Sequence, residues 1–521
     1  MRGTAGVTSM PFRMKIPIIP LVAALVPALI LAEEPAAKAI FDGKSLNGWK
    51  GMEGIWKVED GALTGETTEP NQVPYNTFLV WQDGEVDDFE LTFDYRIVGG
   101  NSGVQVRAYD VPGSKPEEYR IAGYQSDIDS GETYSGIVYS EGERGILANR
   151  GEQTRVTDGP DGQPKIEVTA KLAESADLQK LIKQQDWNSY RIVAEGNTLT
   201  NYINGAKFSS IVDEGKAARR SGKLAIQVHR WDTPMKIQLK NVMLKRLPLK
   251  DRKKIAFFAG KPSHGPGEHE HRAGCLLLAD QINAHFSDRM LATVYTGGWP
   301  DDPTALDNVD AIVSFTDGGG GHPLNYHLKK LDVAMRRGVG LGCIHYAVET
   351  TAGEFGQKFL EYIGGYFEPH WSVNPHWKAA YASFPDHEVT RGVQPFATQD
   401  EWYYHMRFRP GMAGVTPILS ALPPDETLSR GDGPHSGNPA VRAAIANKEA
   451  QHTMWVATRE GNDGRGFGCT GSHFHKNWGD DNYRKLLLNA CAWIAKAEIP
   501  ADGVPSPALS AEQLAANLDP K

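Results

Sequence analysis

Residues 255–275, IAFFAGKPSHGPGEHEHRAGC, divide the chain into two differently built halves. An apolar run over residues 255–258 is followed by a polar loop and then by a helical pattern that begins near Cys275. A strand, a polar loop and a helix in this order are typical of the start of an α/β domain, and ligands bind at such loops. Only one of the chain's 16 histidines, His229, precedes this stretch. We therefore expect a domain boundary here, with a short charged linker at residues 248–252.

The first half, residues 39–247, reads as a series of short β runs separated by Gly, Pro, Asn and Asp turns. The clearest runs are residues 78–81, 89–97, 103–107, 187–194, 198–203, 223–229 and 236–244. A helical pattern appears only around residues 171–183. Many regularly spaced strands with little helix favour an all-β domain, either a β-sandwich or a jelly roll.

Three of these strands place polar side chains on one face, because side chains alternate along a strand. The residues expected on this face are Gln105, Arg107, Gln125, Asp127, Asp129, Gln227 and His229. Tyr139 and Glu141 follow closely in the sequence and are placed to form a rim. One polar face is ordinary in a sandwich, so each residue alone indicates a solvated surface. The repeat over three strands favours a binding face.

Beyond residue 252, apolar strands alternate with helical patterns as far as residue 496. We expect strands at residues 254–258, 291–295, 309–315, 339–345, 452–458 and 466–470, and helices at 270–286, 325–337, 354–363 and 481–495. Continuous apolar strands between helices predict a parallel sheet covered on both faces, which is a doubly wound α/β domain. The Pro- and Ala-rich residues 497–521 predict a flexible end.

Histidines gather where these strands end, and the strand ends of a doubly wound sheet meet at one crevice. They include His264, His269, His271, His322, His345, His370, His376, His387, His473 and His475, and the carboxylates of Asp386, Asp400 and Glu401 stand among the same groups. Neutral histidines that hydrogen-bond a polyol are the favoured interpretation.

Three other interpretations stay open. A divalent metal would take its ligands from His269, His271, His473 and His475. Cys343 would be a nucleophile, although it lies in an apolar run without the elbow motif. The glycine run 318–321 would hold a phosphate, although it lacks the Lys-Ser/Thr of a nucleotide loop.

The net charge of −9 gives no basis for nucleic-acid binding, since phosphate neutralisation needs clustered Lys and Arg. Basic residues before an apolar run at 16–31, which closes at Ala32, predict a signal peptide over residues 1–32. The run is shorter than the ~20 residues that a membrane span needs. We therefore expect an exported protein, periplasmic or extracellular, with no span in the mature chain. The 12 Trp and 18 Tyr are compatible with a small sugar as its partner. The sequence indicates no oligomeric state.

The chain has four cysteines: Cys275, Cys343, Cys469 and Cys491. They form no CxxC pair, which excludes a thiolate zinc ribbon and a disulfide-dense scaffold. Buried free thiols are favoured, with a disulfide in an exported protein as the alternative.

The first half resembles the 3-keto-disaccharide hydrolase domain family over six motifs in order: FDGKSLNGWK, NSGVQVR, GYQSDID, SGIVYSEG, WNSYRIVAEGNTLTNYING and KLAIQVH. The resemblance implies a concanavalin-like jelly roll that cleaves glycosides whose C3 hydroxyl has been oxidised to a ketone. Such a ketone acidifies the proton on C2, so a base can remove it and expel the C1 substituent, after which water adds back.

On the polar face we expect Asp127 or His229 to be the base, and Arg107 and Gln125 to be the donors that stabilise the enolate. Further substrate contacts are expected from Gln105, Asp129, Tyr139, Glu141 and Gln227. Many relatives carry Glu where this chain has Gln125.

The second half resembles the ThuA-like trehalose-utilisation family in the motifs SHGPGEHEHRAG, FTDGGGGH, GVGLGCIHYA, GGYFEPH, DEWYY and GRGFGCTGSHFHKNW. The resemblance implies a flavodoxin-like fold, as in class I glutamine amidotransferases, and a role with disaccharides or their keto derivatives. His345 lies where the amidotransferase nucleophile turn would be, so it ranks first among the functional histidines. His264 and His370 are expected as further sugar contacts.

We therefore expect a two-domain enzyme that acts on 3-keto-glycosides. In the alternative, the jelly roll is a non-catalytic carbohydrate-binding module attached to a sugar-processing, metal-dependent α/β domain. The amide at Gln125 favours this alternative. No cofactor follows from the sequence with certainty, and a divalent metal in the second domain stays open.

Overall fold

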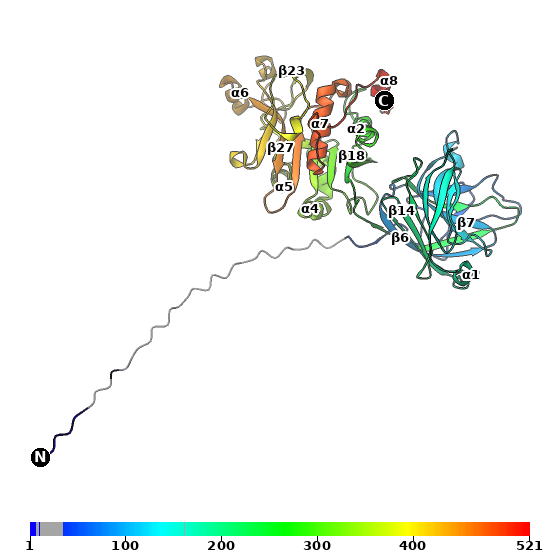
Figure 1. The fold of residues 1–521 in the computed structure, drawn as a ribbon. Coiled ribbons are helices and arrows are strands. Elements are labelled where there is room, and N and C mark those ends of the chain that lie inside the picture. Colours follow the sequence, from blue (N-terminus) through cyan, green and yellow to red (C-terminus); the bar gives the residue numbers. More distant parts are fainter. Residues whose placement is uncertain (7–9, 11–34, 161, 521) are drawn as a thin grey trace. The chain divides into compact units, whose positions relative to one another are not determined.

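The computed structural model describes residues 1–6, 10, 35–160 and 162–520. The expected signal peptide, residues 1–32, therefore lies almost wholly outside the described residues. Residues Pro35–Lys521 form one compact unit, in which a β-sandwich is followed along the chain by an α/β domain (Figure 1). Among the described residues, no helix is both long and apolar enough to cross a membrane.

Two sheets form the sandwich, which confirms the all-β prediction for the first half. The first runs in the order β12 (Pro164–Lys171), β11 (Glu152–Asp158), β15 (Ala206–Asp213), β14 (Thr198–Ile203), β13 (Asn188–Glu195), β6 (Phe89–Val98), β17 (Lys236–Arg246), β4 (Ala62–Glu66) and β3 (Trp56–Glu59), with β1 (Lys38–Ala39) beside β17. The second runs in the order β10 (Gly145–Ala148), β9 (Val138–Glu141), β8 (Ile121–Asp129), β7 (Asn101–Asp110), β16 (Lys223–Val228), β5 (Thr77–Trp81) and β2 (Trp49–Lys50). The short helix α1 (Ser175–Gln179) covers only part of the expected helical stretch.

The sandwich core follows from strand alternation. Along β6, the apolar residues from Phe89 to Ile97 are buried at every second position, while the residues between them are half-buried. In the second sheet, Val104, Val106 and Ile226 belong to the same core. Alternation therefore turns Gln105 and Gln227 to the other face of that sheet.

The α/β domain is built on a sheet in the order β19 (Met290–Thr296), β18 (Lys253–Ala259), β20 (Ala311–Phe315), β21 (Gly340–Ile344), β28 (Arg465–Cys469), β27 (Gln451–Thr458) and β26 (Val415–Ala421). The strands from β19 to β28 are parallel, as expected. The last two are antiparallel, so the sheet is mixed and the all-parallel prediction is wrong at this edge.

Helices cover both faces of this sheet. On one face, α2 (His271–His285) and α7 (Asp481–Ile494) share a core with Ile255 and Phe257. On the other, α4 (Leu328–Arg336) and α5 (Glu354–Ile363) pack with Ala256 and Phe258, the alternate residues of β18. This two-sided burial confirms the doubly wound α/β fold. The expected helix at 325–337 is divided in two, since α3 (Pro323–Tyr326) precedes α4.

The chain between α5 and β27 adds structure that the sequence did not predict. It contains the pair β22 (Gly365–Tyr366) and β25 (Arg407–Phe408), the hairpin β23 (His376–Tyr381) and β24 (Phe396–Glu401), and the helix α6 (Pro439–Ala446). Strand β24 of this hairpin ends at Glu401, a residue of the histidine cluster described below.

The C-terminal residues pack against the α/β domain. We expected residues 497–521 to be a flexible end, yet Val504 is fully buried and its backbone N–H donates to Asn489. Arg484 donates to Ser506 and Pro507, and α8 (Ala511–Ala515) has a capping box at Ser510. The expectation of a flexible end is therefore not met.

A buried charge network joins residues of the sandwich to residues of the α/β domain. Asp87, just before β6, lies 2.5 Å from Lys254 Nζ on β18 and accepts a hydrogen bond from Asn308. Arg246 on β17 pairs with Asp302 at 2.8 Å. Although burial opposes ionisation, Lys254 and Arg246 hold the pKa of Asp87 at about 2.

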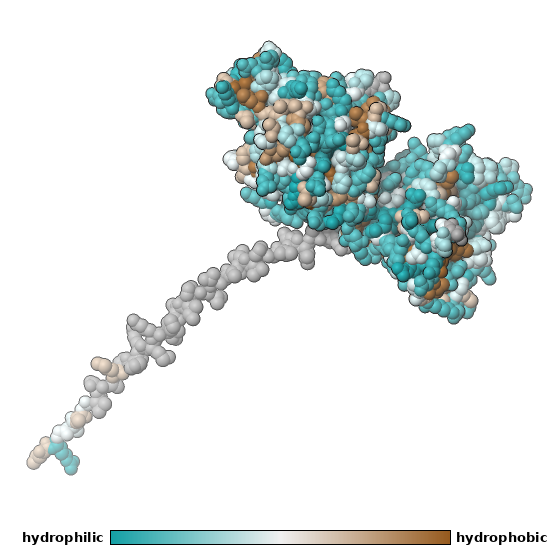
Figure 2. All heavy atoms as spheres, turned by 45° about the horizontal axis from the view of Figure 1, so that its top comes forward, coloured by the Kyte–Doolittle hydropathy of each residue, from teal (hydrophilic) through white to brown (hydrophobic). Residues whose placement is uncertain are grey.

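The four cysteines are free and buried, as favoured from the sequence. The face of the protein drawn in Figure 2 is mostly hydrophilic, with small separate hydrophobic areas on the described residues.

Candidate functional site

A cavity of about 400 Å³ opens on the face of the second sheet that points away from the sandwich core. It is lined by Asn76, Asn101, Gln125, Asp127, Asp129, Tyr134, Ile137, Tyr139, Glu141, Ile146, His229 and Trp231. Four of the seven residues expected on the polar face line this cavity: Gln125, Asp127, Asp129 and His229. The two expected rim residues, Tyr139 and Glu141, line it as well. Strand alternation therefore located four residues of a concave surface on the expected face.

Asp127 is the most unusual group in this cavity. It lies on β8 with only 5% of its surface exposed, and Gln125 donates to its Oδ1 at 2.7 Å. Burial raises the pKa of Asp127 to about 8, against the opposing effect of Gln125, and the nearby Glu141 raises it further. A carboxyl group with such a pKa holds a proton at neutral pH and becomes a base in mild alkali.

Three glutamines from neighbouring strands hold this carboxyl in place. Gln105 donates to Gln125 at 3.3 Å, and Gln125 in turn donates to both Asp127 and Gln227. Gly103 makes room for this arrangement, since a Cβ there would lie 2.5 Å from Gln125 Cγ. Gln105 and Gln227 are buried beside the cavity without lining it, so they act on the site through Gln125.

This network changes the role expected for Gln125. Both N–H groups of its amide are already engaged, one by Asp127 and one by Gln227. In this arrangement Gln125 orients Asp127 and has no N–H left for an enolate.

Arg107 does not reach the cavity. A bulge between Val106 and Tyr109 breaks the alternation, and Arg107 has a left-handed backbone with φ +51°. Its guanidinium is buried against Asp88 at 2.8 Å and donates to the carbonyl of Gly196. The structure thus gives Arg107 a structural ion pair where we expected a donor to the substrate.

The rim combines aromatic and polar groups. Trp231 and Tyr134 are 46% and 44% exposed, which leaves their rings open to a ligand. His229 follows β16 and donates from Nδ1 to the carbonyl of Arg230 at 2.6 Å, so Nε2 of the neutral ring is an acceptor. Glu141 accepts from Asn76. Asp129 accepts from the backbone of Thr133 and Tyr134 and so shapes the adjacent loop.

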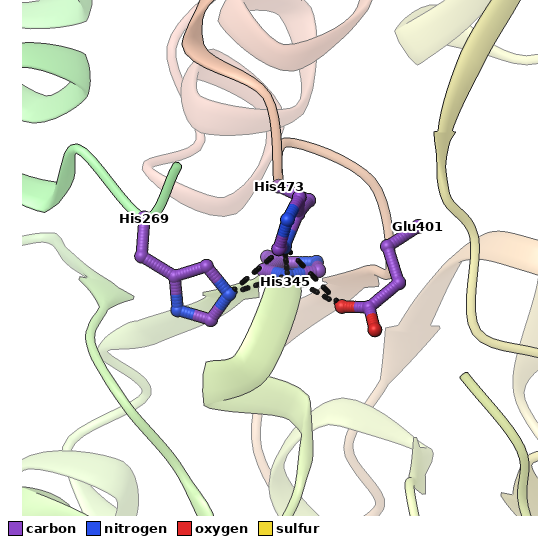
Figure 3. Close-up of side chains that lie close together, drawn as sticks. All are labelled: His269, His345, Glu401 and His473. Carbon is purple, nitrogen blue, oxygen red and sulfur yellow. Dashed lines mark hydrogen bonds and ion pairs between the residues drawn. The ribbon is translucent and has the colours of Figure 1, made fainter. Parts of the chain in front are cut away.

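A second cluster lies in the α/β domain, where His269, His345, His473 and Glu401 converge (Figure 3). His345 directly follows β21, and Glu401 ends β24. His269 belongs to the loop between β18 and α2, and His473 to the loop after β28. The ends of β18, β21 and β28 thus bring the three histidines together, as expected for this fold, and the hairpin supplies Glu401.

The nitrogen atoms of the cluster are closely spaced. His345 Nε2 lies 3.0 Å from His269 Nε2 and 3.3 Å from His473 Nδ1. His269 Nε2 lies 3.1 Å from His473 Nδ1. Glu401 Oε2 lies 3.4 Å from His345 Nε2 and 3.3 Å from His473 Nδ1. These four residues can hold a metal ion, and three of them are buried.

The other predicted histidines lie outside this donor set. His271 bonds to the carbonyl of Lys261 and His475 to that of Leu514, while His370 is exposed. His264 stacks on His269 with ring centroids 3.5 Å apart, near Asp317. Of the four metal candidates, the structure brings together His269 and His473 only. It adds His345, which the sequence placed among the sugar contacts, and Glu401, which the sequence placed among the polar groups at the strand ends but not among the metal ligands.

Two other interpretations find no support in the geometry. Cys343 is fully buried, and burial raises the pKa of its thiol far above the usual range. Gly318 packs so tightly that a Cβ would lie 2.1 Å from the carbonyl oxygen of Tyr346. Gly318 therefore serves close packing at this turn.

Two known families match this chain, one in the β-sandwich half and one in the α/β half. The model of the 3-keto-alpha-glucoside-1,2-lyase-like domain matches residues 36–245, and the trehalose utilisation (ThuA) model matches residues 292–494. These matches confirm the expected fusion of the two domains. No curated protein matches the chain.

Solved structures resemble each half. A glycosyl hydrolase candidate from Parabacteroides distasonis is 20% identical, with a TM-score of 0.26 and coverage of 40% of this chain and 94% of its own. The carbohydrate-binding module CBM66 from Bacillus subtilis is 14% identical, with a TM-score of 0.24 and coverage of 38% and 95%. A ThuA-like protein from Bacteroides uniformis is 16% identical, with a TM-score of 0.31 and coverage of 47% and 91%.

Proposed function

From these two family matches and the cavity around Asp127, we propose that the protein is an exported enzyme that cleaves 3-keto-glycosides in its β-sandwich. Asp127 takes the proton from C2 of the sugar, next to the C3 ketone. The electron pair of that C–H bond moves towards the C3 ketone and gives an enolate. When the enolate collapses, a C1=C2 double bond forms as the C1–O bond breaks, and the departing alcohol takes up the proton that Asp127 removed. Water then adds across the double bond.

The observation that carries this proposal is the position of Asp127. A general base works best when its pKa lies near the working pH, and burial brings the pKa of this carboxyl to about 8. Gln125 fixes the carboxyl by a hydrogen bond of 2.7 Å, so that it need not be ordered during the reaction. His229, at the rim and less buried than Asp127, is the alternative base.

Other groups of the cavity suit a sugar substrate. Trp231, Tyr134 and Tyr139 offer aromatic surface, and Asp129 and Glu141 offer acceptors for hydroxyl groups. The enolate oxygen needs donors, for which Asn101 and Tyr139 stand at the cavity wall. These two take over the role first expected of Arg107 and Gln125.

Product analysis tests the proposal. The full-length protein is offered a 3-keto-disaccharide and its unoxidised parent, with Asp127→Asn and His229→Gln as variants. We expect release of the aglycone from the keto sugar alone, and its loss in Asp127→Asn. Loss only in His229→Gln would move the base to the rim. Binding of the keto sugar without turnover by the native protein would overturn the enzymatic proposal and favour a carbohydrate-binding module.

A further inference from the structure

We propose that His269, His345, His473 and Glu401 bind one divalent first-row transition-metal ion in the α/β domain. The spacing of the four donor atoms is the first argument. The five distances given above between pairs of these atoms run from 3.0 to 3.4 Å. Donors at the usual ~2.0–2.2 Å from a zinc-like ion stand about 3.3 Å apart in a tetrahedron, and slightly closer in an octahedron.

The second argument is where the imidazole protons lie. His345 Nδ1 lies 2.8 Å from the carbonyl oxygen of Thr470, which can only accept, so this nitrogen carries the proton. His269 Nδ1 lies 3.1 Å from Asp317 Oδ1 and donates to that carboxylate. In each neutral ring, Nε2 then carries a lone pair and no proton. Two lone pairs facing each other at 3.0 Å repel, and a cation between them turns this repulsion into binding.

These outer hydrogen bonds are the kind that orient metal-binding histidines. A ligating imidazole usually donates its other N–H to a carbonyl or a carboxylate, which fixes the ring. Here His345 uses a carbonyl and His269 uses a carboxylate. Two of the three imidazoles are therefore oriented by an outer hydrogen bond.

Hydrogen bonds also hold the backbone around the cluster. Asp400, next to Glu401, accepts from the N–H groups of Ser472, His473 and Phe474 at 2.7, 3.1 and 3.3 Å. The N–H of His269 donates to the carbonyl of His473 at 3.0 Å. His269 and His345 also hold left-handed backbone conformations, with φ +46° and +55°. Such strain in non-glycine residues collects at functional sites.

The donor set selects the class of ion. Three imidazole nitrogens and one carboxylate suit Zn²⁺, Mn²⁺, Fe²⁺ or Co²⁺, whereas Mg²⁺ and Ca²⁺ prefer oxygen donors throughout. In Figure 3, His269 and Glu401 lie on opposite sides of the pair His345 and His473. Exposed side chains of Asp317, His264 and His376 lie next to the cluster, so an ion can enter from solvent.

Elemental analysis of the full-length protein tests the proposal, with Co²⁺ reloading as a spectroscopic readout. We expect one transition ion per chain and a visible Co²⁺ absorption band after exchange. His345→Ala and Glu401→Gln should each lower the metal content at least tenfold, while His475→Gln should keep it. His475 is a matched control, being buried two residues from a ligand and outside the donor set.

Two outcomes would overturn the assignment: no stoichiometric ion and no Co²⁺ band in the native protein, or full metal content in both ligand variants. Glu401→Gln keeps the size of the side chain, and circular dichroism shows whether each variant folds. The readout needs no sugar and is independent of the sandwich site. Asp127→Asn should keep its metal, so failure of the proposed keto-glycoside cleavage leaves this result interpretable.

Discussion

The Nε2 atoms of His269 and His345 lie 3.0 Å apart, although 76 positions separate the two residues. Neither nitrogen has a proton to offer the other while Thr470 and Asp317 accept from the opposite side of each ring. The fold therefore holds two acceptors face to face, which favours a cation between them.

Chelation of the metal should destabilise the protein. An ion that binds the folded state at 100 times its Kd stabilises it by about 2.7 kcal/mol. Removing it with EDTA should lower the melting temperature by a few degrees, and Zn²⁺ should restore it where Mg²⁺ does not. Differential scanning fluorimetry measures this. His345→Ala should show no response to EDTA, and an equal response in that variant would contradict the site.

Asp127→Asn should lower kcat/KM on a 3-keto-glycoside by about 10²–10⁴-fold, because a positioned general base typically contributes that much. In the native protein kcat/KM should rise with pH towards a midpoint near 8, since the base must lose its proton. Steady-state kinetics from pH 5 to 9 measure both. A flat profile in the native protein would mean that another group removes the C2 proton.

The raised pKa of Asp127 also predicts how the stability of the protein depends on pH. Its pKa is raised from 3.8 to about 8 on folding, so between these values the folded state keeps a proton that the unfolded state has lost. The contribution of Asp127 to the free energy of unfolding is thus fully present below pH 4. It is lost as pH rises towards 8, by at most about 1.4 kcal/mol per pH unit.

Asp127→Asn removes this titration. The stability of the variant relative to the native protein should therefore increase from pH 4 to pH 8, by a few kcal/mol in total. Urea unfolding at several pH values checks this. A constant difference between the two proteins would show that Asp127 ionises normally in the folded state.

Gly103→Ala should alter the orientation of Asp127 indirectly, by displacing Gln125. The new Cβ would lie 2.5 Å from Gln125 Cγ and displace the amide that orients the carboxyl. We expect a lower kcat with a nearly unchanged fold, and a shift of the pH midpoint because the hydrogen bond from Gln125 lowers the pKa of Asp127. Kinetics with a native-like midpoint would indicate that Gln125 has no positioning role.

The buried network between the two domains predicts a large loss of stability. Asp87→Ala leaves Lys254 without its carboxylate in the protein interior, which typically costs about 3–5 kcal/mol. Glu174→Ala, which removes the exposed pair with Lys171, should change stability by less than ~0.5 kcal/mol. Chemical denaturation compares the two variants. Similar effects in both would mean that the network contributes little.

Much of the fold could be predicted from the sequence because the apolar residues alternate clearly in the strands and recur with helical spacing in the helices. Strand β14 coincides with the predicted residues 198–203, and α5 with residues 354–363. The antiparallel strands β26 and β27 were not foreseen as such, since an apolar strand carries no sign of its direction. The end of the chain was misjudged because its buried contacts, such as Val504 with Asn489, are made by isolated residues without periodicity.

The sites show where pattern reasoning ends. Alternation found Gln125, Asp127 and His229, but a single bulge sent Arg107 to the other side of the sheet. Among the histidines, the i,i+2 spacing permitted metal ligation without specifying which members of each pair would bind. In the loops, only His269 and His473 point into the cluster. Glu401 was expected among the polar groups at the strand ends but not as a metal ligand, because only the packing of β24 brings it to His345.

The order of the four donors along the chain also governs when the cluster can assemble. His473 is made 204 residues after His269. A chain that stops short of residue 473 lacks one of the four donors. Under the proposed assignment, full metal affinity would therefore develop only after most of the second domain has been made.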